Sequence, residues 1–64
     1  MLAIITIRMD SDAFRQASGT ELCRILRLLA RRIETEAPIT AALHDSNGKK
    51  VGTFRLDGEE GGEP

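Results

Sequence analysis

The histidine at position 44 is the side chain of this chain best able to move a proton near neutral pH, and Asp45 follows it directly. A histidine beside a carboxylate is half of a general acid–base arrangement. The arrangement also needs a nucleophile or a third group that the fold holds in place, and no sequence motif marks one. We therefore expect His44 to be an exposed residue at a strand end. The sequence predicts no catalytic residue and no enzymatic activity.

Candidate metal ligands are too few for a structural site. Zinc in such sites takes four Cys and His ligands, whereas this chain has one of each, Cys23 and His44. Asp45, Asn47 and Gly48 have the residue types of a calcium loop but lack the twelve-residue series of ligands that ends in a glutamate. No glycines form a phosphate-binding pattern between a strand and a helix. We predict no metal and no cofactor.

A row of arginines is the most informative surface feature of the sequence. Arg24, Arg27 and Arg31 recur on consecutive turns of a predicted helix, so they could neutralise the phosphates of a nucleic acid. Lys49 and Lys50 add positive charge on a predicted hairpin. The chain offers no exposed aromatic residues on which single-stranded nucleic acid would stack, which disfavours that class of ligand.

The same row could instead be an ordinary solvated face of a helix. Glu34 lies three residues after Arg31, and Glu36 lies four residues after Arg32. Both spacings allow ion pairs within one helix. In this interpretation the arginines only keep the surface soluble.

Leu28 favours a third interpretation, in which the row is a protein-binding surface. It projects between Arg24 and Arg31 on the polar side of the predicted helix. An apolar anchor among guanidinium groups suits a partner that presents carboxylates. The residues predicted to bind a partner are Arg24, Arg27, Leu28, Arg31, Lys49 and Lys50. The predicted partner is a host protein or protein complex, with nucleic acid as the less favoured alternative.

The segment Ser18–Glu36 must position most of these side chains, and it has the pattern of an amphipathic helix. Its apolar residues recur at three- and four-residue steps and predict one buried face: Leu22, Ile25, Leu26, Leu29 and Ile33. The arginines fall on the opposite face. Ser18 followed by Glu21 predicts a capping box at the start, and Pro38 predicts that the helix stops near Glu36.

Three further segments have the composition of β-strands, at residues 2–9, 39–44 and 50–57. Asn47-Gly48 between the last two predicts a hairpin, because both residues tolerate the positive φ of tight turns. Gly52 predicts a bulge or a close approach of another backbone. Phe14 is the one large apolar residue of the polar connection 10–17, and we expect it to fold onto the start of the helix.

The resulting fold class is α+β, in the order β-α-β-β, with one helix on a three-stranded, mainly antiparallel sheet. Either the third strand lies between the other two, antiparallel to both, or the first strand lies beside the second. Alternation predicts that the helix covers the face of Ala3, Ile5, Ile7 and Met9. Leu2 and Ile4, with Val51, would lie on the open face. The sequence therefore predicts a homodimer through that face or through an edge strand.

The length and composition of the chain limit the number of domains and the size of the core. The 64 residues make one domain, which we place at residues 1–57, and its core has two phenylalanines and no tryptophan or tyrosine. A domain this small is marginally stable, which favours oligomerisation or docking on a partner. Cys23 has no second cysteine to pair with, and we expect a buried, inert thiol.

We expect a soluble cytoplasmic protein with an acidic tail. Residues 1–56 carry nine basic and six acidic residues, whereas residues 57–64 carry four acidic ones. The segment 58–64 is predicted to be a disordered acidic tail. The opening residues have neither the basic start nor the cleavage site of a signal peptide, and no apolar run reaches the length of a membrane span.

Three stretches resemble a group of small accessory proteins from bacteriophages and prophages: DAF at 12–14, ELCRILRLLARRIE at 21–34 and LHDSNGKKVGTFRL at 43–56. The chain departs from that group at Lys49, where the group has an asparagine. The resemblance implies a phage accessory role and brings no catalytic residue. Phage proteins of this size are often stoichiometric inhibitors, including the anti-CRISPR type, so the resemblance implies an inhibitor of a host defence complex that acts by blocking a surface.

Overall fold

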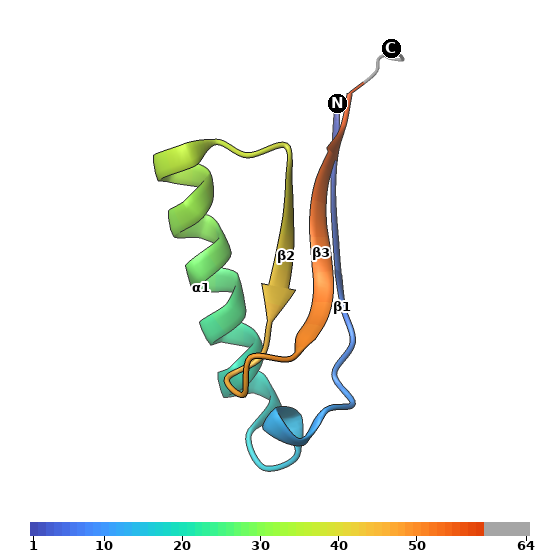
Figure 1. Cartoon of the computed structure of the whole chain (residues 1–64), viewed down its shortest axis with the longest axis vertical. Coiled ribbons are helices and arrows are strands. Elements are labelled where there is room, and N and C mark those ends of the chain that lie inside the picture. Colours follow the sequence, from blue (N-terminus) through green and yellow to red (C-terminus); the bar gives the residue numbers. More distant parts are fainter. Residues whose placement is uncertain (59–64) are drawn as a thin grey trace.

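One long helix and three strands, in the predicted order, form the main elements of the part of the chain that the structure describes (Figure 1). The computed structural model describes residues 1–58. The strands are β1 (Leu2–Ile7), β2 (Thr40–His44) and β3 (Lys50–Asp57), and the helix is α1 (Ser18–Glu36). A short 3-10 helix, η1 (Asp12–Phe14), lies between β1 and α1. The predicted α+β class is confirmed, with the first two strands shorter than predicted and the acidic tail from residue 59 onward outside the described residues.

The sheet has the order β1-β3-β2, with β3 antiparallel to both neighbours. Of the two predicted arrangements, the one with the last strand in the centre is therefore the right one. Since both outer strands run against β3, they run parallel to each other. Each of them leaves one edge without a strand partner in the described part of the chain.

The helix has the predicted bounds, but its first turn is built differently from the prediction. The N-cap is Ala17, and no side chain caps it, so the predicted capping box of Ser18 and Glu21 is wrong. The Glu21 carboxylate is taken up by other partners, described below. At the far end Ala37 adopts a left-handed φ of 47° and its N–H donates to the carbonyl of Ile33 at 3.0 Å. Pro38 follows at once, so the helix ends where the sequence predicted.

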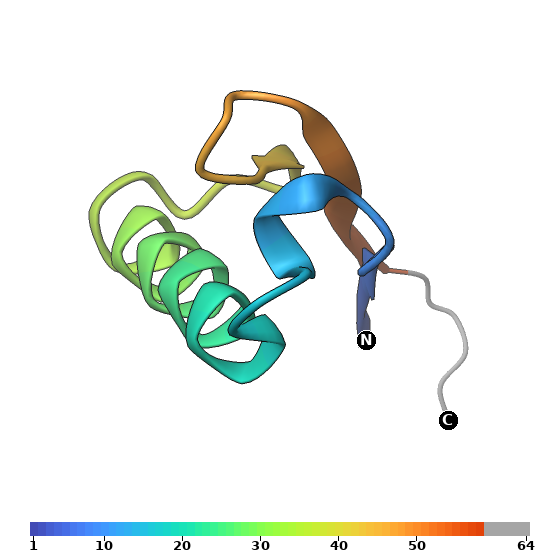
Figure 2. The same ribbon diagram turned by 90° about the horizontal axis from the view of Figure 1, so that it is seen from below.

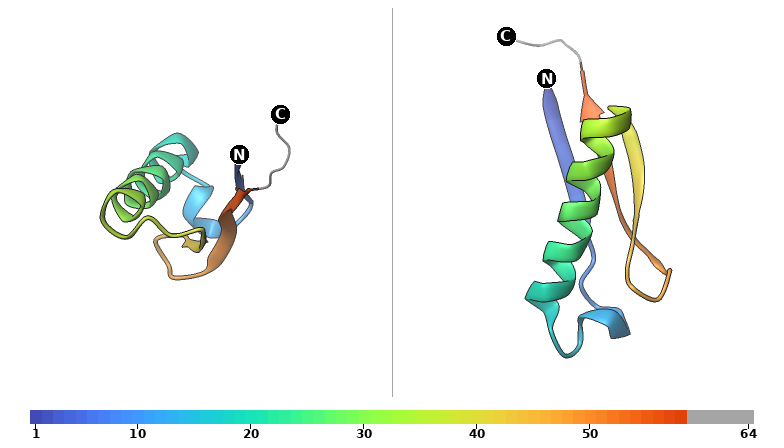
Figure 3. Two further views of the ribbon diagram at one scale, coloured as in Figure 1. Left: turned by 90° about the horizontal axis from the view of Figure 1, so that it is seen from above. Right: turned by 90° about the vertical axis from the view of Figure 1, so that its left-hand side faces the viewer.

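The helix lies beside β2 and away from β1. Figures 1 and 2 and the left view of Figure 3 agree that β1 is the strand farthest from α1, and α1 packs against β2 and η1. The buried hydrophobic core is correspondingly small: Phe14, Ile25, Leu29, Ala41, Leu43, Val51 and Phe54. Ile5 pairs with Phe54 and so shares its face, yet it is 46% exposed. Leu26 and Ile33, at the edge of the helix stripe, are also exposed.

The two alternatives predicted at Gly52 both occur: β3 has a bulge next to it, and the backbone of Thr6 approaches it closely. The bulge moves Val51 into the core. Leu43 pairs with Gly52 while His44 pairs with Lys50, so β3 carries one extra residue at this point. A bulge breaks the alternation of side chains. Val51 is consequently buried, and its predicted place on an open dimer face is wrong.

The open face of the sheet is otherwise largely polar. Arg55 pairs with Ile4 and Thr40, and Thr53 pairs with Thr6, so these residues share the side away from Phe54. Leu2 is exposed on this face and Ile4 is half-buried. Two apolar residues in such surroundings do not form the continuous apolar surface that a face-to-face dimer needs.

Two other expectations about single residues have opposite outcomes. Phe14 is buried against the start of the helix, which confirms the prediction. Cys23 is exposed, so the predicted buried thiol is wrong. Cys23 lies two residues before Ile25, and at 3.6 residues per turn this spacing places it on the far side of the helix from that buried residue.

We predict that Gly52→Ala destabilises the protein by about 1–3 kcal/mol, the usual range for forcing extra atoms into a packed site. A Cβ on Gly52 would clash with the backbone carbonyl of Thr6, in the neighbouring strand. Urea unfolding followed by circular dichroism measures the effect. Gly19→Ala is the matched control, since a Cβ there meets nothing within 4 Å and alanine favours a helix. Equal stability of the Gly52→Ala variant and the wild type would contradict the prediction.

Candidate functional site

The outer face of α1 carries an open depression with Leu28 in it. Besides Leu28, its lining residues are Thr20, Arg24, Arg27 and Arg31, which lie along one side of the helix. Leu28 is 48% exposed. The structure thus brings together four of the six residues predicted to bind a partner.

Two members of the arginine row have no ion partner on the protein. The predicted pair of Arg31 with Glu34 does not form, whereas Arg32 and Glu36 do pair, at 3.9 Å. Among residues 1–58, no carboxylate lies within ion-pair distance of Arg27 or Arg31. Their guanidinium groups are therefore available to an acidic partner.

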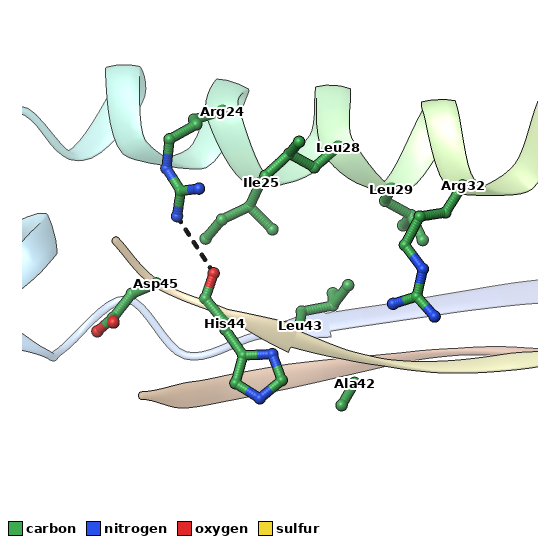
Figure 4. Close-up of a pocket in the computed structure, with 9 residues that line it drawn as sticks. All are labelled: Arg24, Ile25, Leu28, Leu29, Arg32, Ala42, Leu43, His44 and Asp45. Atoms are coloured by element: carbon green, nitrogen blue, oxygen red, sulfur yellow. Dashed lines mark hydrogen bonds between the residues drawn. The ribbon is translucent and has the colours of Figure 1, made fainter. Parts of the chain in front are cut away.

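Arg24 differs from the other arginines of the row, because its guanidinium turns toward the end of β2. Its guanidinium binds the Glu21 carboxylate through two hydrogen bonds of 2.8 and 3.1 Å and donates to the His44 carbonyl at 3.2 Å (Figure 4). A fork of this kind is the geometry that makes arginine–carboxylate pairs strong. Arg24 is half-buried, and it ties α1 to the end of β2.

Lys49 and Lys50 do not join the Leu28 depression. They line a second hollow together with Arg8 and Asp10, at the other end of the hairpin connection. The two hollows share no residue. The six predicted partner-binding residues consequently form two separate groups.

A buried pair of carboxylates joins three parts of the chain, and sequence reasoning missed it. Glu21 accepts a hydrogen bond from the Ser46 N–H at 2.7 Å in addition to those from Arg24. Asp45 accepts from the Ser11 hydroxyl at 2.7 Å. It also accepts from the N–H groups of Asn47 and Lys49, both at 2.9 Å. The helix start, the hairpin and the η1 loop are thus joined through two side chains that are 7% and 4% exposed.

The turn itself depends on Asp45 and on one glycine. The Gly48 N–H donates to the Asp45 carbonyl, and Gly48 alone takes a positive φ, of 84°, so Asn47 does not adopt the left-handed conformation. An aspartate that accepts from the N–H two residues later is a common turn former. That signal was present in the sequence. Nothing in the sequence showed that Ser11, 34 residues away, would complete the site.

His44 and Asp45 do not form an acid–base pair. The Asp45 carboxylate is occupied by Ser11 and the turn, and Figure 4 shows the imidazole of His44 pointing away from it. The His44 side chain is exposed beside the groove between α1 and β2. Among residues 1–58, no group of three His, Cys, Asp or Glu side chains is placed to hold a metal ion.

Both buried carboxyl groups have lowered pKa values. The hydrogen bonds from Arg24, and then that from the Ser46 N–H, lower the pKa of Glu21 despite the opposing effect of burial. The hydroxyl of Ser11, followed by the Lys49 and Asn47 N–H groups, lowers the pKa of Asp45. The ionised forms therefore belong to the folded state.

We predict that the free energy of unfolding falls as the pH falls below about 4.5, where unfolded carboxyl groups begin to bind protons. A depressed folded-state pKa adds stability above that pH and loses it on acidification through the folded-state value. Asp45→Asn should be less stable than wild type at pH 7. The difference should shrink toward pH 3, because the wild-type carboxylate loses its charge as it binds a proton.

Thermal unfolding across this pH series measures both effects. Asp12→Asn is the control, because the Asp12 side chain is 82% exposed and its one ion pair, with Arg15, is a surface pair. An Asp45→Asn variant with the stability of the wild type at pH 7 would contradict the structural role of Asp45.

No helix among residues 1–58 is long and apolar enough to cross a membrane. Comparison with known proteins adds no relative: no protein-family model, no curated protein and no solved structure matches this chain.

Proposed function

We propose that this chain is a small non-enzymatic binding module that docks the outer face of α1 on an acidic surface of a partner protein. The observation that carries the proposal is the position of Leu28, which is 48% exposed in a depression bordered by Arg27 and Arg31. Neither arginine pairs with a carboxylate among residues 1–58. An apolar centre with a polar, charged rim is the usual anatomy of a protein interface.

The energetics of this surface suit a protein partner. Burying a whole leucine side chain contributes about 1.5–3 kcal/mol, so covering the exposed half of Leu28 contributes about 1 kcal/mol. Arg27 and Arg31 can form forked hydrogen bonds with carboxylates on the partner. Arg24 lies beside them with its guanidinium already held by Glu21 and His44, so little side-chain freedom is lost there on binding.

The resemblance to phage and prophage accessory proteins points to the class of partner. A phage inhibitor of a host defence complex, as in the anti-CRISPR type, acts stoichiometrically and needs a complementary surface. The helix face supplies such a surface on a chain of 64 residues. We therefore propose inhibition of a host defence complex in the host cytoplasm as the biological role, exerted by blocking a surface.

Binding of nucleic acid is the second candidate, and the unpaired state of Arg27 and Arg31 is the observation in its favour. A phosphate backbone would be contacted best by one continuous basic track. Lys49 and Lys50 instead line a separate hollow, which also contains Asp10. The protein partner is therefore the better supported of the two.

We predict that Leu28→Glu weakens partner binding at least tenfold, because it places a carboxylate in the centre of a surface that meets carboxylates. The tagged wild-type chain and the variant are used in parallel to capture proteins from a nuclease-treated bacterial lysate. The captured protein is then titrated with each chain at two salt concentrations.

Ile39→Glu is the matched control, since Ile39 is 71% exposed and lies outside the depression. It should bind like the wild type. Undiminished binding by Leu28→Glu would contradict the proposal. Capture of nucleic acid alone, with an affinity that falls steeply as salt rises, would favour the second candidate.

A further inference from the structure

Within residues 1–58, the free edge of β1 carries none of the features that usually prevent strands from joining. Edge strands are normally protected by charged residues, proline, a bulge or a covering segment. The six residues of β1, LAIITI, include no charge and no proline, and the register of β1 with β3 is continuous. Because α1 lies on the side of β2, it does not cover β1 (Figure 2).

The opposite edge of the sheet, at β2, is protected. The outward-facing carbonyl of His44 accepts a hydrogen bond from Arg24. Leu28 and Arg32 of α1 line a groove with Ala42 of β2, so the helix flanks this edge (Figure 4). Of the two outer strands, β1 is thus the one available for pairing.

The hydrogen bonds to β3 determine which groups of β1 point outward. The Arg8 N–H donates to the carbonyl of Val51 in β3. In an antiparallel pair the residues that face the partner alternate with residues that face away. The backbone N–H and C=O groups of Ala3, Ile5 and Ile7 therefore lie on the free edge. The side chains of these three residues lie on the helix side of the sheet, since Ile5 pairs with Phe54.

From this geometry we propose that β1 pairs antiparallel with β1 of a second copy of this chain, with Ile5 opposite Ile5 at the twofold axis. This register places Ala3 opposite Ile7 of the other copy. Each N–H and C=O of the three outward residues then has a partner. The product is a continuous sheet of six strands in the order β2-β3-β1-β1-β3-β2.

The side chains are self-complementary in this register. On the helix side, Ile5 meets its counterpart, and this residue is 46% exposed in the single chain. On the open face, Ile4 lies opposite Thr6 of the other copy. Leu2 lies opposite Arg8 of the other copy, and Asp57 pairs with Leu2 in β3, so basic and acidic side chains share one row across the junction.

A second copy would also compensate for the small size of the hydrophobic core. The seven buried hydrophobic residues are 2% to 7% exposed, and none is completely sequestered among residues 1–58. Pairing removes the unprotected edge from both copies at once, as a twofold interface does. Both helices then lie on the same side of the six-stranded sheet, and each keeps its Leu28 surface uncovered, so the dimer does not depend on the proposed function.

Charge substitutions at Ile5 test the register directly. Like charges directly opposite each other destabilise a strand pair, whereas opposite charges stabilise it. Sedimentation equilibrium should show that the wild type is a dimer and that Ile5→Lys and Ile5→Glu are each at least tenfold weaker in self-association. An equimolar mixture of the two variants should recover the dimer. Ile39→Lys, which changes a still more exposed apolar residue away from the β1 edge, should dimerise like the wild type.

Hydrogen exchange of the unaltered chain decides the question even if the Ile5 variants fail to fold. In the dimer the N–H groups of Ala3, Ile5 and Ile7 should be protected, with protection that rises with protein concentration. A monomeric wild type would overturn the proposal. A dimer that survives Ile5→Lys, or that leaves these three N–H groups unprotected, would overturn it as well, since another surface would then hold the copies together.

Discussion

The hydrogen bonds of two buried carboxylates, Glu21 and Asp45, are the interactions on which the rest of this structure depends. Glu21 joins the first turn of α1 to the hairpin through the Ser46 N–H, and Asp45 joins the hairpin to the η1 loop through Ser11. Seven buried hydrophobic residues are a small core for a domain. The hydrogen-bonded carboxylates fix the positions of α1, the hairpin and the η1 loop relative to one another, which so small a core does not determine by itself.

The same interactions decide which surfaces remain available. By binding Arg24, Glu21 fixes this guanidinium toward the end of β2. Arg27 and Arg31 stay outside and line the same depression as Leu28. Since the helix start is tied to the hairpin at β2, α1 lies along that edge and leaves β1 uncovered. The partner surface and the free edge thus have a common physical cause.

Local patterns were sufficient to predict the bounds of the helix, the hairpin and the bulge at Gly52, because spacing and turn chemistry act over a few residues. They failed where the outcome depends on contacts between distant segments. Glu21 matched a capping box within four residues, but the amide of Ser46 and the Arg24 guanidinium bind it instead. Val51 followed the alternation of a regular strand, and the bulge reversed it. The position of α1 beside β2, which leaves Ile5 exposed, depends on contacts across the whole fold, so local patterns could not predict it.

Direct titration of the two carboxyl groups tests this account most simply. Carbon-13 NMR of the side-chain carboxyls across a pH series reports the pKa of each group in the folded protein. The account predicts that Glu21 and Asp45 both titrate below their ordinary values, and that the amide signals of Ser46, Asn47 and Lys49 move with them. Titration of either group at or above its ordinary value, without a response from those amides, would contradict it.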